Sequence, residues 1–434
     1  MKVPFINTSE ELDRAVDEAF RVTNQKHREE KGTGGELLFY SVPLRNSKEG
    51  IDYINYQTPA LIIINFSDGQ IDGFAIMQQV VADPWLNHGG IIALYEDSST
   101  LEKIDELNDT NIIISVAHYE LKDLLARVLQ VVRENQQILF QRAIHSGLMS
   151  NMSGKFFLAP DISIIPCYTN LIANYLYNLG LISPEDKQRV GLSLAELLIN
   201  AIEHGTCGIS YEEKSEFMEK HGAIHELIKQ KCSDPKIAAR TVTFQYEISP
   251  TESTYRIEDE GDGFDWRKYM NSEEPQDLLA FHGRGIMMTM NMVAKIGYND
   301  KGNVVTIAIS HQQNTSNTVP LVFQDQETVD FQPEDLVFKQ GEESNFLYYI
   351  AEGEYRVEVD NKQVAIITPA DILMGEMSFL LQEIRSANVI ANTPGKLIKI
   401  SNINFVNSIK EQPYFGLFLA KLLAQRLYNL ARIK

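Results

Sequence analysis

Short apolar runs alternate with segments of helical spacing from Glu36 to about Asn135. The runs LLFYSV, ALIIINF, GIIALY and NIIISV have the length of buried strands, and amphipathic stretches separate them. Strands that alternate with helices in this way are typical of a parallel sheet whose strands are joined by crossover helices. The pattern therefore predicts a small α/β domain over residues 36–140.

A charged amphipathic helix is expected before this domain, and a long helix is expected at its end. Residues 8–31 have such a pattern, which ends at a glycine-rich break. We therefore place residues 1–35 outside the sheet, as an N-terminal helix available for partner or dimer contacts. A second long helix begins near Tyr119 and extends to about Ser146, where MSNMSG breaks it, so residues 141–153 are predicted to be a connector.

Two further domains are predicted after the connector. Residues 154–311 mix helical and strand patterns, and residues 312–320 (QQNTSNTVP) are polar without periodicity, as in a linker. Residues 321–434 begin with many short strands and close with a helix from about Tyr414. The predicted fold class is a multidomain α/β and α+β protein.

Composition and charge argue against several classes of protein. A chain of 434 residues is long enough for about two to four domains. The formal charge of -20 disfavours nonspecific binding to nucleic acid or to anionic membranes. The longest apolar stretch, around Ala60 to Phe66, is far short of the ~20 residues that span a bilayer. The first residues lack the pattern of a secretory signal, so we expect a cytoplasmic protein. The three cysteines are widely spaced and indicate neither a disulfide framework nor a zinc site.

A helix with two specified ends carries the first candidate site. Ser183 is placed to cap it, the next residue is proline, and Gly205 is expected to end it. Its apolar stripe is Val190, Leu194, Leu197, Leu198 and Ala201. Glu196 and Asn200 lie one turn apart and off that stripe, so they can face one ligand together. Taken alone, a Glu and an Asn at this spacing more often decorate a solvated face.

The segment TYRIEDEGDGFD carries the second candidate. It delivers Asp259 at the end of a predicted strand, followed by Gly261 and Gly263. A carboxylate there can accept a hydrogen bond from an exocyclic amine such as that of adenine, and the glycines allow backbone to approach a flat ligand closely. An acidic turn is the alternative, whereas a calcium loop of the EF-hand type would need a later bidentate Glu that is missing.

The segment FHGRGIMMTMNMVAKIG carries the third candidate. Gly283 and Gly285 flank Arg284 directly before an apolar helix. A glycine-rich entry to a helix exposes free amides to a phosphate, and the arginine adds a charged donor. A lone GxG before a helix is more often a tight turn.

The three motifs in this order resemble the ATPase module of gyrase, histidine kinases and anti-sigma-factor serine kinases, which has the Bergerat fold, an α/β sandwich. NAIEHG, GRG and the final strand in YNDKGNVVTIAI resemble the anti-sigma-kinase branch. The resemblance implies ATP and Mg²⁺ as ligands, with Asn200 holding Mg²⁺, Glu196 acting as base and Asp259 reading adenine. It also implies that Gly283 to Gly285 close over the phosphates.

A histidine kinase is disfavoured by the region upstream of these motifs. The candidate phosphoacceptor there is His145, in QRAIHSGLMS, and no acidic residue follows it. We interpret His145 as an ordinary connector residue. A charged, helical insertion of about 35 residues, from TCGISY to AARTV, separates the first motif from the next strands. It is a solvated surface or, as the smaller alternative, a surface for partner docking.

The first domain resembles a two-component receiver domain that has lost its chemistry. In PALIIINFSDGQIDGFAIM the phosphoacceptor position is Asn65, and no acidic pair follows the expected first strand in LLFYSVPLRN. Tyr95 stands at the usual Thr or Ser position and Ser115 at the usual Lys position. Since an amide cannot form an acyl phosphate, this resemblance implies a pseudo-receiver that works through its surface.

The last domain resembles a cyclic-nucleotide-binding domain, a β-roll with a lid helix. In MGEMSFLLQEIRSANVIA, Glu376 would accept the ribose 2′-hydroxyl and Arg385 would pair with the cyclic phosphate, with backbone near Gly375 and Ser386 completing the cradle. A surface ion pair is the alternative for Glu376 and Arg385 in isolation. The chain departs from the family at two turns, where Glu334 and Ala370 replace usual glycines, and the run up to Gly375 is one residue longer.

Together these features predict a cytoplasmic serine/threonine kinase of the anti-sigma-factor type, controlled by cAMP or cGMP. Its partner would be an anti-sigma-factor antagonist or a sigma factor, and a homodimer is expected from the connector helix by analogy. The first alternative is a non-catalytic partner switch in which ATP orders a lid and sequesters the target. A scaffold whose ATP site only stabilises the fold is the third hypothesis.

Overall fold

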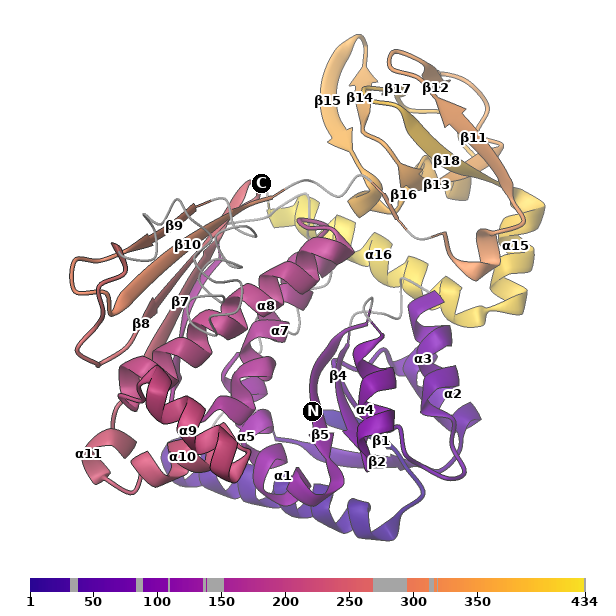
Figure 1. Cartoon of the computed structure of the whole chain (residues 1–434). Helices are drawn as coiled ribbons and strands as arrows, with labels where there is room; N and C mark the ends of the chain where they lie inside the picture. Colours follow the sequence, from indigo (N-terminus) through magenta and orange to yellow (C-terminus); the bar gives the residue numbers. More distant parts are fainter. Residues whose placement is uncertain are drawn as a thin grey trace.

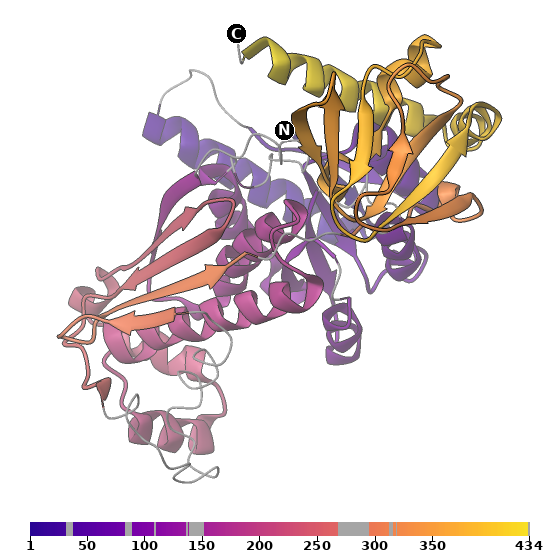
Figure 2. The same ribbon diagram turned by 90° about the horizontal axis from the view of Figure 1, so that it is seen from above.

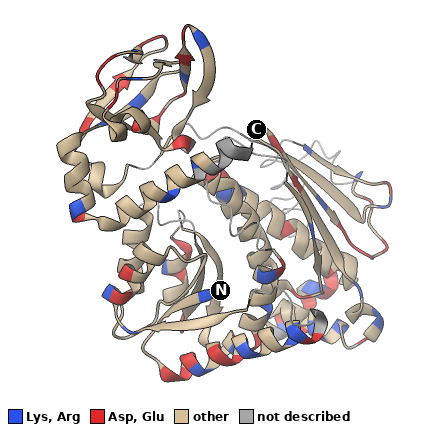
Figure 3. Ribbon diagram, turned by 180° about the vertical axis from the view of Figure 1, so that it is seen from behind, with Lys and Arg blue, Asp and Glu red and all other residues tan. Residues whose placement is uncertain are grey.

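The computed structural model describes residues 1–31, 38–82, 89–107, 110–135, 138, 152–267, 295–311, 316–317 and 319–432. They form an N-terminal α/β domain, a central α/β sandwich and a C-terminal pair of antiparallel sheets (Figure 1). Seen from behind, Lys and Arg are interspersed with Asp and Glu over all three parts (Figure 3). Within the described residues, no helix combines the length and apolarity that crossing a membrane would require.

The N-terminal domain is a doubly wound parallel sheet. Its strand order is β2-β1-β3-β4-β5, the order of flavodoxin-like sheets. The strands are β1 (Lys2–Ile6), β2 (Tyr40–Leu44), β3 (Leu61–Asn65), β4 (Gly90–Tyr95) and β5 (Ile112–Ala117). Helices α1 (Glu10–Lys31) and α5 (Leu121–Glu134) pack on one face, and α2 (Ser47–Gln57), α3 (Gly73–Ala82) and α4 (Ser98–Asp105) lie on the other.

The structure corrects the prediction that residues 1–35 lie outside this sheet. Strand β1 pairs with both β2 and β3, and its side chains Val3 and Phe5 are fully buried. Helix α1 also packs within this domain, since the Arg133 guanidinium of α5 donates to the Thr23 carbonyl of α1 at 2.8 Å. Five residues at the start of the chain are too short a signal for periodicity to reveal, and LLFYSV, predicted to be the first strand, overlaps the second strand, β2.

The central domain is an antiparallel sheet covered by two helices. Its strand order is β6-β7-β8-β10-β9. The strands are β6 (Met152–Leu158), β7 (Val242–Ile248), β8 (Glu252–Glu258), β9 (Lys295–Tyr298) and β10 (Val304–Ser310). Helices α7 (Ile165–Asn178) and α8 (Pro184–Asn200) lie across one face. The predicted charged insertion is helical and contains α9 (Tyr211–His221), α10 (Ile224–Lys231) and α11 (Pro235–Ala238).

The N-terminal and central domains share one hydrophobic core. Buried side chains of α1, α5 and β5 are continuous with those of α7, α8 and the central sheet. Polar side chains of the central domain also reach carbonyls at and beside the edge strand β5. Asn170 Nδ2 donates to Ile113 O and Asn174 Nδ2 to Ile112 O, both at 3.2 Å, and Lys187 Nζ donates to Thr110 O at 2.5 Å. The edge of the parallel sheet is therefore covered by α7 instead of being open to pairing.

The C-terminal domain packs two four-stranded antiparallel sheets face to face. One has the order β11-β18-β13-β16 and the other β12-β17-β14-β15. The strands are β11 (Glu327–Phe331), β12 (Leu336–Phe338), β13 (Phe346–Glu352), β14 (Tyr355–Val359), β15 (Lys362–Ile367), β16 (Leu373–Met374), β17 (Asn388–Ala391) and β18 (Gly395–Ser401). Helices α15 (Asn402–Glu411) and α16 (Pro413–Arg432) follow. Part of the predicted linker belongs to this domain, because Asn317 N donates to Ala351 O at 2.7 Å and Val319 packs on the core.

Helix α16 connects the C-terminal domain to the N-terminal one. Figures 1 and 2 show it running beneath the β-sheets of this domain. Phe415, Phe418, Leu419 and Leu422 are buried in the C-terminal core. Across the other contact, the rings of Tyr414 and Tyr56 meet edge to face at 6.5 Å, and Lys421 Nζ donates to Thr58 Oγ1 at 3.0 Å. The predicted lid helix is thus also an interdomain contact.

Candidate functional site

Helix α8 forms as its sequence predicts at the N-terminus and differs at the C-terminus. Ser183 Oγ accepts from Asp186 N at 3.1 Å, and all five residues of the predicted stripe are buried. Beyond Asn200, however, the chain continues as a π-helical turn, Ala201–Thr206, which we call the π-turn. Gly205 lies inside this turn and does not end the helix, which is a correction. π-helical turns are frequent at functional sites because they redirect side chains out of the regular helix.

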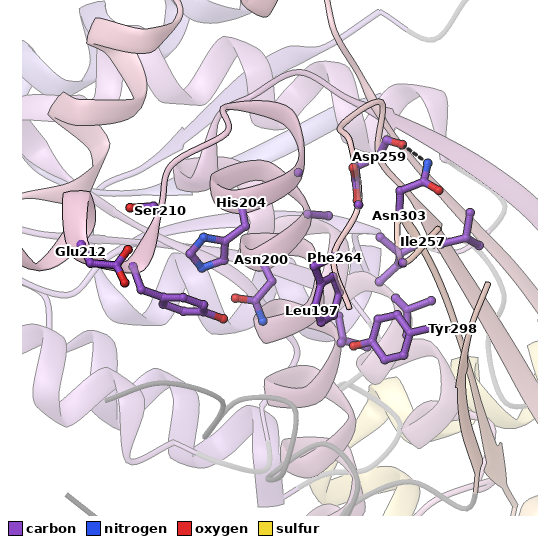
Figure 4. Close-up of a pocket in the computed structure, with 17 residues that line it drawn as sticks. Leu197, Asn200, His204, Ser210, Glu212, Ile257, Asp259, Phe264, Tyr298 and Asn303 are labelled. Atoms are coloured by element: carbon purple, nitrogen blue, oxygen red, sulfur yellow. Dashed lines mark hydrogen bonds between the residues drawn. The ribbon is translucent and has the colours of Figure 1, made fainter. Parts of the chain in front are cut away.

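A cavity of about 250 Å³ lies beside the π-turn. It is bounded by α8, the π-turn, the start of α9, the loop after β8, and strands β8, β9 and β10. Its lining residues are Leu197, Asn200, Ala201, His204, Gly205, Ser210, Tyr211, Glu212, Ile257, Asp259, Gly263, Phe264, Tyr298, Gly302, Asn303, Val304 and Val305. Figure 4 shows Asn200 and His204 projecting from the helical side, with Asp259 and Asn303 on the strand side. Two of the sequence-predicted motifs therefore meet in one cavity.

Asp259 is held rigidly at the end of β8. Its side chain is 9% exposed, and Oδ1 accepts from Gly261 N at 2.8 Å. Its backbone is clamped by Asn303, whose carbonyl accepts from Asp259 N at 3.0 Å and whose Nδ2 donates to Asp259 O at 2.8 Å. Burial raises the pKa of Asp259 above its ordinary value, against the lowering effects of the Gly261 hydrogen bond and of Lys301. A carboxylate fixed in this way is suited to accept one directed hydrogen bond from a ligand.

Glycine is required at three positions around Asp259 because neighbouring atoms leave no room for a Cβ. A Cβ on Gly205 would lie 2.3 Å from Asp259 Cγ, and a Cβ on Gly261 would lie 2.2 Å from the Gly205 carbonyl oxygen. Gly263 has φ +78°, and a Cβ there would lie 2.0 Å from the Lys301 carbonyl oxygen. The two motifs therefore touch through backbone, which only glycine permits.

The side chains of Glu196 and Asn200 contact each other, but only that of Asn200 lines the cavity. Asn200 Nδ2 donates to Glu196 Oε1 at 3.3 Å, and Asn200 lines the cavity whereas Glu196 does not. The hydrogen bond orients the amide, so Asn200 Oδ1 is left as the oxygen that can serve a cation. Three other predicted contacts, Gly283, Arg284 and Gly285, lie outside the described residues, as does His145.

The histidine and aromatic side chains that line the cavity were not among the predicted site residues. His204 Nδ1 lies 2.6 Å from the Ile209 carbonyl, which places its proton on Nδ1, and its ring lies 4.3 Å from that of Tyr211. Phe264 and Tyr298 meet edge to face at 5.3 Å. The His of NAIEHG and the Phe of GDGF stand inside the motifs themselves and could have been added. Tyr298 comes from β9, and no local signal points to it.

The carboxyl edge of the N-terminal sheet holds a closed polar network. Asn65 is buried, its Nδ2 donates to Asn7 Oδ1 at 3.0 Å, and its Oδ1 lies 3.0 Å from His118 Nε2. Two residue assignments are therefore corrected. Asn7, after β1, is the residue that follows the first strand, and His118, after β5, approaches Asn65 where Ser115 was expected. Burial lowers the pKa of His118, which favours the neutral ring in this network.

The predicted cyclic-nucleotide cassette is assembled around Arg385. Its guanidinium is 3% exposed, and Nη1 donates to Gly375 O at 2.9 Å and to Ser378 Oγ at 3.1 Å. Nη2 donates to the Phe346 carbonyl, and the group stacks 4.2 Å from the centroid of Phe338. Burial lowers the pKa of Arg385. Ser386, the next residue, is exposed.

Glu376 is partnered by a residue of α16. It begins α14 (Glu376–Leu381) and is 8% exposed. Arg426 binds it through Nη1, and Nη2 of the same guanidinium donates to Asp371 O at 2.6 Å and to Leu373 O at 3.1 Å. The carboxylate predicted to bind ribose is thus bound by the helix that closes the domain.

The departures from the family lie in turns, as expected. Glu334 has φ +72°, so the turn keeps the left-handed conformation that glycine would favour, and Arg356 binds its carboxylate at 2.5 Å. That interaction lowers the pKa of Glu334. The longer run before Gly375 contains Ile372 with φ +68°. Gly375 itself has φ +75°, and a Cβ there would lie 2.3 Å from Arg385 Nη1.

Two segments of the chain match known domain families. Residues 170–309 match the histidine kinase-like ATPase domain, and residues 328–412 match the cyclic nucleotide-binding domain. The protein therefore contains an ATPase domain of the histidine kinase-like class followed by a cyclic nucleotide-binding domain. No curated protein matches the chain.

Solved structures are similar to about a quarter of the chain. The catabolite activator protein of Thermus thermophilus is 27% identical over 26% of this chain and 54% of its own, with a TM-score of 0.24. The chain thus spans about half the length of that protein. A cyclic nucleotide-binding domain from Methylobacillus flagellatus is 21% identical over 24% of this chain and 62% of its own, with a TM-score of 0.22. The sensor domain of the transcriptional regulator DNR from Pseudomonas aeruginosa is 20% identical over 26% and 77%, with a TM-score of 0.23.

Proposed function

We propose that this protein is a cytoplasmic serine/threonine kinase of the anti-sigma-factor type whose ATP site is controlled by cAMP or cGMP. The observation that carries the proposal is the meeting of Asn200 and Asp259 in one cavity lined by glycine backbone. A nucleoside triphosphate needs an acceptor for the exocyclic amine of its base and a ligand for the Mg²⁺ that its phosphates bind. The Asp259 carboxylate is suited to the first role and the Asn200 amide oxygen to the second.

The residues fit a phosphoryl transfer to a hydroxyl. Asp259 would accept from the adenine amine, and Asn200 Oδ1 would hold Mg²⁺, which supplies neutralisation of phosphate charge. The attacking serine oxygen would bond to the γ-phosphorus as the bond to the β–γ bridging oxygen breaks and ADP leaves. Glu196 would take the hydroxyl proton. Gly283, Arg284 and Gly285 are proposed to contact the phosphates.

A second candidate function is a non-catalytic partner switch that sequesters its target when ATP is bound. One observation favours it: Glu196 does not line the cavity, and its carboxylate accepts from Asn200. In this function Glu196 holds the orientation of Asn200 and moves no proton.

The proposed route of control runs through α16. Cyclic nucleotide that binds Glu376 through its ribose must displace Arg426, which anchors α16 to the cassette. Because α16 also contacts α2, its release would free the N-terminal domain from the C-terminal one. The N-terminal domain in turn shares its core with the ATPase domain. We propose that it is a pseudo-receiver, in which Asn65 replaces the phosphoacceptor and the surface carries the signal.

The test is transfer of labelled γ-phosphate from ATP to a candidate antagonist of an anti-sigma factor, with and without each cyclic nucleotide. Transfer that is lost in Glu196→Gln, while calorimetry shows that the variant still binds Mg-ATP, supports the kinase. Equal transfer by both proteins refutes Glu196 as base. ATP-dependent capture of the target without transfer, retained in Glu196→Gln and lost in Asn200→Ala, supports the partner switch. A homodimer would be seen in the mass of the protein by light scattering.

A further inference from the structure

The turn between β9 and β10 packs against the loop that follows β8. Its sequence is NDKGN, and its own side chains fix it, since Asn299 Oδ1 accepts from Gly302 N at 2.8 Å and from Asn303 N at 3.1 Å. The Asn299 carbonyl also accepts from Trp266 Nε1 at 2.8 Å. A Cβ on Gly302 would lie 2.0 Å from the Phe264 carbonyl oxygen, so the turn and the loop touch through backbone. The turn is therefore a fixed support beside the loop that carries Asp259.

Lys301 of this turn donates a hydrogen bond to the loop. Its Nζ lies 2.7 Å from the Gly261 carbonyl oxygen, and the amide of the same Gly261 donates to Asp259 Oδ1 at 2.8 Å. Only the two backbone angles of Gly261 separate these hydrogen bonds, and a glycine restrains neither angle by itself. The lysine therefore supplies a restraint that Gly261 lacks, and it does so one residue away from the amide that orients the carboxylate.

We propose that Lys301 is a positioning residue of the nucleotide site, whose ammonium fixes the Gly261 peptide groups and thereby the direction in which the Asp259 carboxylate faces the adenine amine. The inference rests on the proposed role of Asp259 as the acceptor for adenine, and it does not depend on kinase activity. Lys301 does not line the cavity, in contrast to its neighbours Gly302 and Asn303. It is therefore assigned no contact with ATP, and its effect on binding passes through Asp259.

The charge of Lys301 acts in the same direction as its hydrogen bond. Burial raises the pKa of Asp259, the Gly261 hydrogen bond and Lys301 lower it, and the neighbouring Glu258 raises it. Since an ionised carboxylate is a stronger acceptor than a neutral carboxyl, the ammonium favours the form of Asp259 that binds adenine. Lys301 is exposed, so salt should screen this part of its effect. The other titratable side chains that line the cavity are His204, Tyr211, Glu212 and Tyr298.

The experiment is calorimetric titration of the full chain with a non-hydrolysable ATP analogue and Mg²⁺ over a range of pH, at low and at high salt. Lys301→Met should weaken binding at neutral pH by about 3- to 10-fold, as expected for the loss of one hydrogen bond. It should also move the acid limb of the pH profile to higher pH, by less at high salt than at low salt. Lys301→Arg, which keeps the charge and the donor, should restore both properties.

The matched control removes the same charge from the other end of β9. Lys295 is exposed and pairs in register with Ala308, whereas the turn follows Tyr298 at the opposite end of the strand. Lys295→Met should therefore leave the affinity and the pH profile unchanged.

Asp259→Asn separates this inference from the one on which it rests. If the wild-type protein does not bind the analogue, or if Asp259→Asn binds it equally well, the role of Asp259 is wrong and the role of Lys301 with it. If Asp259→Asn weakens binding and Lys301→Met does not, the positioning role alone is overturned.

Two further results would overturn the positioning role of Lys301. One is weaker binding in Lys301→Met with an equal loss of stability in urea and an unmoved acid limb, because the lysine would then only hold the turn in place. The other is a displacement of the pH profile of the same size when Lys301→Met is made in Asp259→Asn, because the titrating group would then not be Asp259.

Discussion

At the scale of single residues, Asp259 combines burial with a fixed orientation. We predict that Asp259→Asn lowers affinity for ATP by about 10- to 100-fold, as expected when a hydrogen bond to a charged acceptor is lost. The fold should survive, because the amide oxygen can still accept from Gly261 N. Calorimetric titration with a non-hydrolysable ATP analogue measures the change. Glu258→Gln is the matched control, since that neighbour is half-exposed and pairs with Arg256.

The raised pKa of Asp259 gives a pH dependence with a defined sign. Burial makes the carboxyl harder to ionise in the folded protein, so its contribution to stability is present below the unfolded pKa and is lost as pH rises through the folded pKa. Binding has the opposite trend, because the ionised carboxylate is the acceptor. ATP affinity should fall as pH is lowered through the raised pKa, and Asp259→Asn should show a flatter profile. Identical profiles in the two proteins would contradict the role of the carboxylate.

Two glycines of the same region should respond oppositely to alanine. In Gly205→Ala the new Cβ would meet Asp259 at 2.3 Å, so we expect a loss of about 1–3 kcal/mol of stability together with nucleotide binding. In Gly191→Ala, inside α8, the nearest atom is Asn170 Oδ1 at 3.8 Å, and the better helix former should stabilise by about 0.5–1 kcal/mol. Urea unfolding of both variants, followed by circular dichroism, gives the comparison.

At the scale of elements, α16 packs in the C-terminal core and also contacts α2, so a substitution in the second contact tests whether the signal passes through this helix. Tyr414→Ala removes the edge-to-face contact with Tyr56, a type of pair that contributes about 0.5–1.5 kcal/mol. Deuterium exchange in α2 and α16 should accelerate, and the factor by which cyclic nucleotide changes ATP affinity should move toward one. By linkage, ATP must change cyclic nucleotide affinity by that same factor.

The control for this prediction lies on the same helix. Leu427 is 67% exposed, so Leu427→Ala should change neither exchange nor coupling. If Tyr414→Ala leaves the coupling factor at its wild-type value while exchange accelerates, the signal does not travel through the α16–α2 contact.

Elements with strong local signals were predictable, and those set by long-range contacts were not. The cap at Ser183, the stripe of α8 and the strands of the C-terminal domain follow from capping and periodicity, and the structure confirms them. The π-turn carries no periodic signal of its own. The pairing of Asn7 with Asn65 depends on β1 entering the middle of the sheet, which parallel pairing decides and local sequence does not.

At the scale of the whole molecule, the domains differ in their independence. The C-terminal domain has its own core clusters, whereas the ATPase domain completes its core with α1, α5 and β5. We predict that a fragment of residues 319–434 unfolds cooperatively on its own. A fragment of residues 152–311 should melt at a lower temperature than residues 1–311 and bind a hydrophobic dye, because the surface of α7 that faces β5 is then exposed. Equal melting temperatures for the last two fragments would show that the shared core is dispensable.

The shared core also means that a ligand can protect parts of the chain that it never touches. By mass action, a ligand at 100 times its dissociation constant stabilises the folded state by about 2.7 kcal/mol. If the N-terminal and ATPase domains open as one unit, nucleotide in the cavity beside the π-turn would slow proteolysis of α2 and α3, on the far face of the parallel sheet. Protease resistance at one end of the molecule would then report occupancy in the middle of it.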